Sequence, residues 1–311
     1  MSLLRTIPLF SLLLACMAAY AQNVPDTVQT RDHDALSEHC AGELDFIQYL
    51  QGRGAHRDAI FLLHRLAGKP GLDVVMLDSL YDLLGWNYYS LKALDSASQS
   101  WLKVSPASSA YLKSRFFSAW NMMYQGSTAE GEAILHGLAH ALPSKGEDQD
   151  WSKELLAFEL AGARLLQRDY NGYDSLSGTF GRQFYYLAPE EAKLDLHRQH
   201  LAGFRKKKLW KAGLLSAMLP GSGKIYSGKT GEGIAALLVV GALGLITREN
   251  YLKDGLTNWK TLLGGGIFSI YYIGNIWGSV FAAHRHNEAF YQAVDQHILL
   301  DLHLPLRNIF Q

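Results

Sequence analysis

The sequence predicts an all-α chain in which an array of helical hairpins is followed by a C-terminal transmembrane helical hairpin. From residue 44 to about residue 200, apolar residues recur at three- and four-residue spacings, with few β-branched runs. Prolines and glycines interrupt this pattern at intervals that would end helices. After Leu209 the hydrophobic fraction rises sharply, which marks the main domain boundary.

The first 21 residues predict a secretory signal peptide. Ile7 to Ala19 is almost wholly apolar, and Ala19-Tyr20-Ala21 is a small-x-small cleavage pattern. This core is too short for an ordinary spanning helix, although an uncleaved anchor stays open. Lipidation of Cys16 also stays open, because Leu13-Leu14-Ala15-Cys16 loosely resembles a lipobox. We therefore expect an exported chain with a linker at 22–43.

Charge and cysteine content argue against several classes of protein. Acidic and basic residues number 29 each, so no net field attracts nucleic acid. The exported chain would keep Cys40 alone, and one thiol cannot form an internal disulfide. The sequence shows no nucleophile–base set, no paired carboxylates at a telling spacing and no metal cluster. It therefore predicts no enzyme activity, no cofactor, no metal site and no nucleic-acid partner.

Within the hairpin array, a pattern of small and apolar residues recurs at a fixed spacing. Gly85, Ala97 and Trp101 each have an apolar or small counterpart 34 residues later. In each copy small residues would let two helices approach closely, and a large apolar residue would fill the groove beside the crossing. This pattern resembles the tetratricopeptide repeat, which has the same period. The positions that carry the resemblance are Tyr81, Leu84, Gly85, Tyr88, Ala97, Trp101, Ala119, Gly131 and Leu135.

The resemblance implies a concave helical surface over residues 44–188 that binds a protein or peptide. It does not imply catalysis. A helical array without true repeats stays open as the alternative. Four aromatic residues would either line the binding surface or lie in the core: Tyr111, Trp120, Tyr124 and Tyr170.

Residues 189–208 predict one basic juxtamembrane helix. It would begin with Glu190 and Glu191 and end with Arg205-Lys206-Lys207-Lys208, a polarity that suits the helix dipole. A basic cluster directly before Leu209-Trp210 is typical of a chain that approaches anionic headgroups. A solvated helix end is the alternative.

Residues 209–287 predict the membrane domain. Gly233 to Thr247 is apolar, but as a helix it would rise only about 22 Å, less than a hydrocarbon core of about 30 Å. Thr261 to Ala283 carries no charge and is long enough to span. Trp210 to Leu219 is too short to cross, so two crossings are favoured over three. An amphipathic tail would follow at 288–311.

A G-x-x-x-G pattern, Gly274 and Gly278, lies within the last apolar segment. Two glycines one turn apart make a flat groove in which another helix can approach closely. The expected partner is the Gly233 to Thr247 helix of the same chain, and a homodimer contact is the alternative.

Gly223 to Thr230 spells G-x-x-x-x-G-K-T, the P-loop pattern. A working P-loop needs a strand before it, and the preceding segment, Ala212 to Leu219, is not β-branched. The alternative is a tight turn at the membrane surface, in which Pro220 ends a helix, glycines permit backbone turns and a tyrosine anchors the interface. The residues of this turn are Pro220, Gly221, Gly223, Tyr226 and Gly228.

The same run, Leu219 to Gly228, resembles the P-G-x-G-x-x-Y-x-G motif of small uncharacterised bacterial membrane domains, some of the TM2 type. Lys224 stands where Gln is usual, and Ser227 where Asn is common. Tyr271 to Asn275 and Ala282 to Asn287 resemble the Y-x-G-N and A-A-x-x-x-N ends of related proteins. Some relatives occur with the membrane protein insertion efficiency factor. The resemblance implies an architecture rather than an activity.

These observations together predict a non-enzymatic protein of the bacterial cell envelope. It would be anchored in the inner membrane rather than the outer, with its helical repeats in the periplasm as a protein-interaction scaffold. Its partners would be an unidentified protein or peptide and membrane lipid. Two alternatives stay open. One is an envelope or membrane-protein assembly factor that acts through its Gly-rich hairpin, and the other is a nucleotide-binding protein that uses Lys229 and Thr230.

Overall fold

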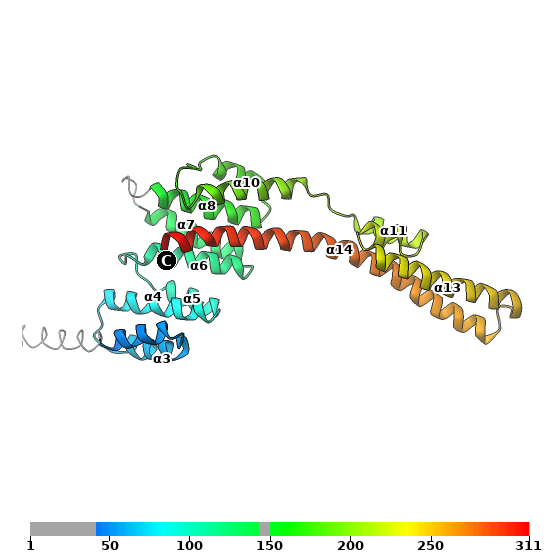
Figure 1. The fold of residues 1–311 in the computed structure, drawn as a ribbon, viewed down its shortest axis with the longest axis horizontal. Coiled ribbons are helices and arrows are strands. Elements are labelled where there is room, and N and C mark those ends of the chain that lie inside the picture. Colours follow the sequence, from blue (N-terminus) through cyan, green and yellow to red (C-terminus); the bar gives the residue numbers. More distant parts are fainter. Residues whose placement is uncertain (1–41, 143–149, 311) are drawn as a thin grey trace, which may run out of the picture. The chain divides into compact units, whose positions relative to one another are not determined.

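The computed structural model describes residues 42–142 and 150–310, and every regular element within them is a helix (Figure 1). The predicted all-α class is confirmed for this part of the chain. Cys16, Cys40 and the predicted signal peptide lie outside the described residues. The chain divides into two compact units, one ending at Ala141 and the other beginning at Leu142. This division falls inside the region 44–188 that the sequence grouped as one domain.

The first unit consists of helices that pack in sequence order. Residues 42–52 are helical and precede α3 (His56–Ala67), α4 (Val74–Ser90), α5 (Leu94–Trp101), α6 (Tyr111–Tyr124) and α7 (Thr128–Ala141). From α3 to α7, each helix packs against the next one along the chain. Gly54 and Gly126 adopt positive φ angles in two of the turns, where a side chain would be strained.

The predicted signature residues lie at helix crossings in this unit. A Cβ on Gly85 would lie 2.2 Å from Nε1 of Trp101, and a Cβ on Gly131 would lie 2.7 Å from the carbonyl oxygen of Ala119. Both glycines therefore allow the two helices of a hairpin to touch. Ala97, Trp101, Ala119 and Leu135 are fully buried. The repeat relationship itself stays a prediction, because such burial is expected in any tightly packed helical array.

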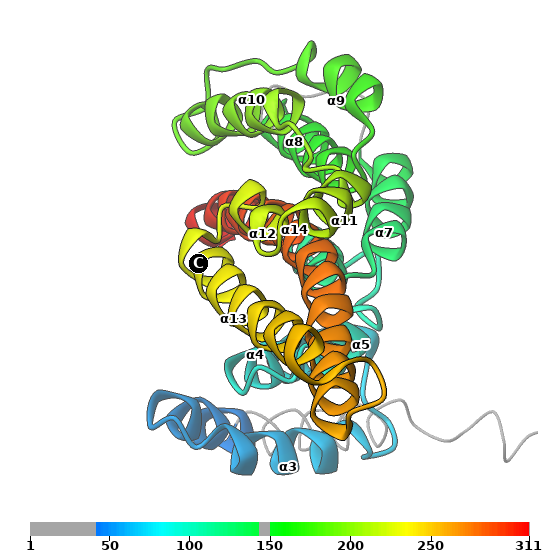
Figure 2. The ribbon, with the colours of Figure 1, turned by 90° about the vertical axis from the view of Figure 1, so that its right-hand side faces the viewer.

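The second unit combines a small helical array with two long helices. The array comprises α8 (Asp150–Leu166), α9 (Tyr170–Ser177) and α10 (Ala188–Gly203). The remaining helices are α11 (Leu209–Met218), α12 (Ser222–Tyr226), α13 (Thr230–Asp254) and α14 (Trp259–Phe310). Helix α13 runs antiparallel to the first half of α14, and α11 and α12 pack where α13 begins (Figures 1 and 2).

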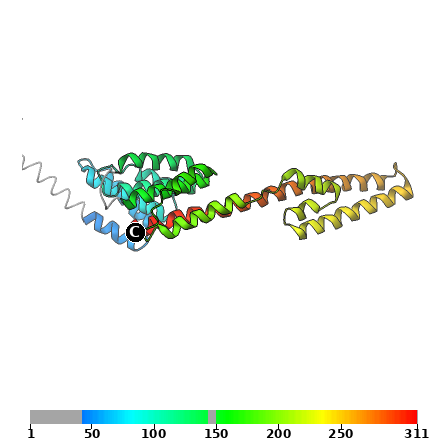
Figure 3. The same ribbon diagram turned by 90° about the horizontal axis from the view of Figure 1, so that it is seen from above.

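Helix α14 is one uninterrupted helix of 52 residues, about 78 Å long. The sequence predicted a membrane span ending at Ala283 and a separate tail at 288–311. The helix does not break there, because residues 284–304 contain neither glycine nor proline. Its second half runs beside α10 (Figure 3) and also packs against α8. The predicted tail is therefore the docked end of the long helix.

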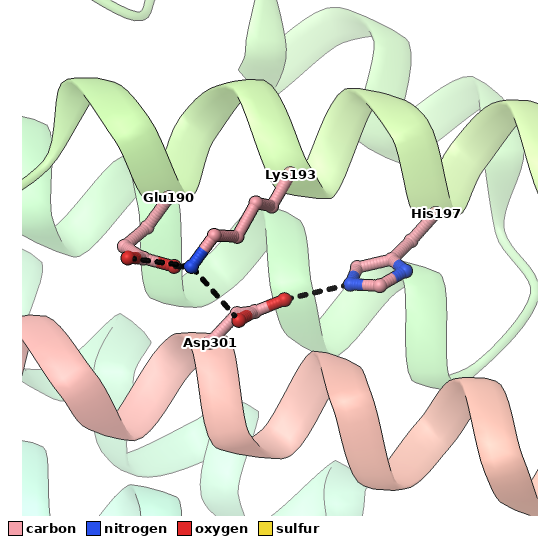
Figure 4. A network of polar contacts seen from close by, with 4 residues as sticks. All are labelled: Glu190, Lys193, His197 and Asp301. Carbon is pink, nitrogen blue, oxygen red and sulfur yellow. Dashed lines mark hydrogen bonds and ion pairs between the residues drawn. The ribbon is translucent and has the colours of Figure 1, made fainter.

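Asp301 joins α14 to α10 (Figure 4). Nε2 of His197 donates a hydrogen bond to its carboxylate at 2.7 Å, and Nζ of Lys193 lies 3.5 Å from the other oxygen. Burial raises the pKa of Asp301, but the His197 hydrogen bond and the Lys193 charge outweigh burial and leave the pKa below its ordinary value. The carboxylate is therefore held in its charged form between two donors.

The turn that follows α8 holds the same half of α14 by a second ion pair. The guanidinium of Arg168 donates to both oxygens of Asp295, at 2.7 and 2.8 Å, and lies 4.7 Å from the centroid of the Tyr291 ring. Near the C-terminus of α14, Leu302 fills the space beside Gly162, where a Cβ would lie 2.4 Å from its Cδ2. These contacts fix the second half of α14 on the array.

We expect Asp301→Asn to loosen the second half of α14 from α10. The change removes a charge-assisted hydrogen bond worth about 1.5–3 kcal/mol. Because the folded pKa is depressed, this stabilisation is present above the ordinary pKa of 3.8 and is lost as pH falls through the lowered value. Faster amide hydrogen exchange over 290–310 at neutral pH would report the change. Asp174→Asn, which removes an exposed pair with Arg198, is the control and should leave that segment protected.

Candidate functional site

Helices α13 and α14 are long and apolar enough to cross a membrane by length and composition. The sequence ended the first apolar segment at Thr247, but α13 continues to Asp254. Its 25 residues give about 38 Å, so the helix exceeds the thickness of a hydrocarbon core once its polar last turns are included. Gly255 then turns the chain with a φ of 76°.

The predicted turn motif connects α11, α12 and α13. Gly221 and Gly228 have φ angles of +85° and +86°, so both provide backbone turns as predicted. Gly223 does not, because it lies inside α12 and has no positive φ. The side of Gly223 that would carry a Cβ instead faces α11, where this Cβ would lie 1.9 Å from the carbonyl oxygen of Ala212. The expectation that Gly223 permits a turn is therefore wrong, and its role is close helix approach.

Gly221 makes a similar backbone contact with α13. A Cβ on Gly221 would lie 1.9 Å from the carbonyl oxygen of Gly233, and a Cβ on Gly233 would lie 2.7 Å from the carbonyl oxygen of Gly221. The two backbones thus touch directly, and neither position has space for a side chain.

A chain of hydrogen bonds links α12 to α11 and α14. The backbone N–H of Gly223 donates to Oγ of Ser216 at 3.0 Å, and this oxygen lies 2.6 Å from Oγ of Ser279. The Ser279 hydroxyl donates to the carbonyl oxygen of Asn275 at 2.9 Å, so Ser216 is the donor in the serine pair. Both serine side chains are buried, and this chain of hydrogen bonds satisfies their hydroxyl groups.

This geometry differs from a phosphate cradle. A P-loop follows a strand and points its backbone N–H groups at the phosphates, whereas this segment follows the helix α11. The N–H groups of Gly223, Ser227, Gly228 and Lys229 all donate to oxygens of the protein. The Nζ atom of Lys229 pairs with Glu232 at 2.7 Å. In the described residues the pattern therefore forms a helical turn in which these four N–H groups are already bonded to the protein.

Tyr226 and Asn287 hold the basic segment beside this turn. The predicted basic helix ends at Gly203, and residues 204–208 are not helical. Lys207 donates its N–H to Oδ1 of Asn287 at 2.8 Å and accepts from Nδ2 at 2.9 Å. The hydroxyl of Tyr226 accepts from the N–H of Lys208 at 3.1 Å, and Nζ of Lys207 lies 4.9 Å from the centroid of its ring. The tyrosine therefore positions the basic segment through hydrogen bonding and a cation–π contact.

The predicted packing of Gly274 and Gly278 against α13 is not observed. A Cβ on Gly274 would meet nothing within 4 Å, and one on Gly278 would lie 3.4 Å from Cε of Lys224 on α12. The small residues between α13 and α14 are others: Gly244 faces Phe268, and Gly264 faces Thr247. The glycine pair instead leaves space on α14 beside the Lys224 side chain.

That space is part of an open groove of about 490 Å³ between α12, α13 and α14. The residues that matter for its chemistry are Lys224, Glu232, Val239, Ile270, Gly274 and Asn275. Asn275 is 5% exposed, and neither its Oδ1 nor its Nδ2 has a hydrogen-bond partner in the part of the chain that the structure describes. The Lys224 side chain is half-buried and makes no hydrogen bond or ion pair with the described residues. Within the described residues, the groove is therefore lined by a buried amide without a hydrogen-bond partner and by an ammonium group without a hydrogen bond or close ion pair.

The sequence pointed to Asn275 only as part of a motif. An amide side chain within an apolar segment is a signal for a functional position, and this signal could have pointed to Asn275. Two buried carboxyl groups in the array also escaped notice, Glu159 on α8 and Glu191 on α10. Burial and the neighbouring Glu154 raise the pKa of Glu191 to about 8, and burial raises that of Glu159. Periodicity does not reveal such groups, because polar residues of the same kind usually face water.

Neither a protein-family model, a curated protein nor a solved structure matches the chain. The resemblance to the tetratricopeptide repeat and to the small membrane domains therefore stays a prediction from the motifs.

We expect Gly223→Ala to destabilise the packing of α12 against α11. The added methyl group would overlap the Ala212 carbonyl, and overpacking of this kind costs about 1–3 kcal/mol. Thermal unfolding of the protein in detergent measures the loss. Gly231→Ala is the matched control, because a Cβ there meets nothing within 4 Å. Equal stability of the two variants would contradict the contact.

Proposed function

We propose that this chain is a membrane-anchored, non-enzymatic protein that holds a helical binding unit at the surface of a bacterial envelope membrane. The observation that carries the proposal is the outward orientation of apolar side chains on α13 and α14. Leu238 is 66% exposed and Ile270 is 72% exposed. We infer that lipid covers these faces.

A core helix of a soluble protein would bury the same side chains. In the most apolar 18-residue windows of α13 and α14, 11% and 22% of the residues are buried. Full burial of one such side chain is worth about 1.5–3 kcal/mol, so a row of them in water would be strongly unfavourable. The non-helical basic segment 204–208 lies beside Tyr226 at the end of α12, where anionic headgroups would attract it.

The first unit supports the scaffold part of the proposal. It exposes large apolar side chains, and Phe61 on α3 is 69% exposed. Of the aromatic residues considered from the sequence, Trp120 is buried in the core and Tyr124 is exposed. Exposed aromatic and aliphatic side chains are typical of surfaces that bind other proteins. Location of this unit in the periplasm rests on the predicted signal peptide.

The second candidate is an assembly factor that acts through the Gly-rich hairpin itself. The groove favours it, because it is lined by Lys224 and by Asn275, whose side-chain amide has no hydrogen-bond partner among the described residues. Polar groups at such positions in membrane segments usually serve a function.

We expect the full chain to stay in the membrane pellet after alkaline washing. The double variant Leu238→Arg, Leu245→Arg should shift it towards the soluble or aggregated fraction, because an arginine near the centre of a spanning helix costs about 2.5–3.5 kcal/mol. Leu196→Arg, at an exposed position on α10, is the matched control. Release of the unaltered chain by the wash would refute the anchor.

We expect affinity capture from detergent-solubilised membranes to recover a specific protein partner. Phe61→Ser should reduce its recovery at least several-fold, since a central aromatic contact often contributes 2 kcal/mol or more, by rough estimate. Tyr185→Ser, at an exposed position of the second unit, should leave recovery unchanged. If both variants retain the partner equally, the surface around Phe61 is not the binding surface.

A further inference from the structure

We propose that the groove between α12, α13 and α14 binds one anionic phospholipid, with its phosphate at Lys224 and Asn275 and an acyl chain along α13 and α14. The inference rests on the proposed membrane anchoring and goes beyond it by assigning a ligand and its contacts. The groove has a polar part and an apolar part, and the two match the two parts of a lipid.

The polar part offers donors without acceptors. The ammonium group of Lys224 has three donors, and the amide of Asn275 adds two on Nδ2. Asn275 is nine-tenths buried or more, and leaving its amide unpaired is unfavourable. A phosphate oxygen accepts from both groups and would offset this cost. The buried, unpaired amide is thus the main sign that a ligand is expected.

The charges around the groove favour an anion. Glu232 also lines it, but its carboxylate is paired with Lys229 at 2.7 Å and lies within electrostatic reach of Lys224 and Arg285. Lys224, Lys229 and Arg285 therefore all act on the one carboxylate that lines the groove, and the Glu232 charge is taken up mainly by Lys229. A zwitterionic headgroup would bring its own cation and gain less from this arrangement.

The apolar part extends away from the polar groups in a direction that suits an acyl chain. From Glu232 to Val239 the groove follows α13 for about 10 Å, and Ile270 lines the same stretch from α14. The two helices run antiparallel (Figure 3), so the stretch from Glu232 to Val239 on α13 and the stretch from Asn275 back to Ile270 on α14 both lead towards the turn that joins the helices. A free phosphate ion would leave this apolar wall uncovered.

The two glycines of the G-x-x-x-G pattern acquire a role in this arrangement. Lys224 lies over Gly278, with its Cε 3.4 Å from the position of a Cβ. Gly274 lines the groove and has free space above it. Side chains at these positions would displace Lys224 or fill the groove.

The experiment uses the full chain in nanodiscs of equimolar phosphatidylglycerol and phosphatidylcholine, followed by native mass spectrometry of the lipid that stays bound. We expect the unaltered chain to retain phosphatidylglycerol in preference to phosphatidylcholine. Lys224→Gln should reduce the retained fraction about tenfold, as loss of one charge-assisted hydrogen bond implies. Gly274→Leu should reduce it similarly by filling the groove.

Two matched variants control for charge and size. Lys211→Gln removes an exposed cation on α11, outside the groove, and Gly241→Leu adds the same side chain at a position on α13 with nothing within 4 Å. Both should retain phosphatidylglycerol as the unaltered chain does. Equal loss in the controls, or no lipid preference in the unaltered chain, would overturn the proposal.

Asn275→Leu separates a binding role from a structural one. The change removes an unpaired buried amide, so thermal stability in phosphatidylcholine nanodiscs should stay constant or rise while phosphatidylglycerol retention falls. A large loss of stability in these nanodiscs would show that Asn275 serves the fold, and would overturn its assignment to the lipid.

Two further measurements distinguish the source of failure. An unaltered chain that resists alkaline washing but shows no preference for phosphatidylglycerol would refute the lipid site and leave the anchor intact. A chain released by the wash would refute both. Soluble glycerophosphoglycerol should compete poorly, because it lacks the acyl chains. Effective competition would overturn the lipid assignment and show that the groove binds a free phosphate ester.

Discussion

The packing of α11, α12 and α13 depends on backbone contacts that leave no space for a Cβ. Gly223 contacts α11, and Gly221 and Gly233 contact each other. At each of these positions a Cβ atom would overlap a backbone carbonyl oxygen. These contacts fix the short helix α12 against its neighbours. They thereby place Tyr226 against the basic segment and Lys224 over α14. The groove exists because α12 is held at this position.

The long helix α14 combines two environments that proteins usually separate. Its first half exposes apolar side chains beside α13, and its second half is docked on α8 and α10 through Asp295 and Asp301. A continuous helix transmits position stiffly, because each residue adds a fixed rise and rotation. Asn275 in the groove and Asp301 on the array therefore belong to one rigid element.

Much of the local structure could be predicted from residue types. Positive φ at Gly221 and Gly228 follows from their place beside a proline and between helices. Among the expectations that differ from the structure, three have reasons that illustrate what a sequence pattern leaves out. Gly223 was read as a turn residue, although glycine serves close approach equally well. The basic helix ends at Gly203, and the backbone N–H groups of Lys207 and Lys208 then donate hydrogen bonds to Asn287 and Tyr226. These two partners lie far away in the sequence. The end of α14 was read as a tail because its docking surface was unknown.

The sequence by itself determined the all-α class, the apolar character of the last two helices and the position of the main turn. These properties depend on periodicity, composition and local backbone preference, which are readable within a short window. The tertiary structure alone decided which helix each glycine faces, that Gly274 and Gly278 border a groove, and that Asn275 lacks a partner. These properties depend on contacts between residues distant in the chain, and a pattern along one segment does not specify them.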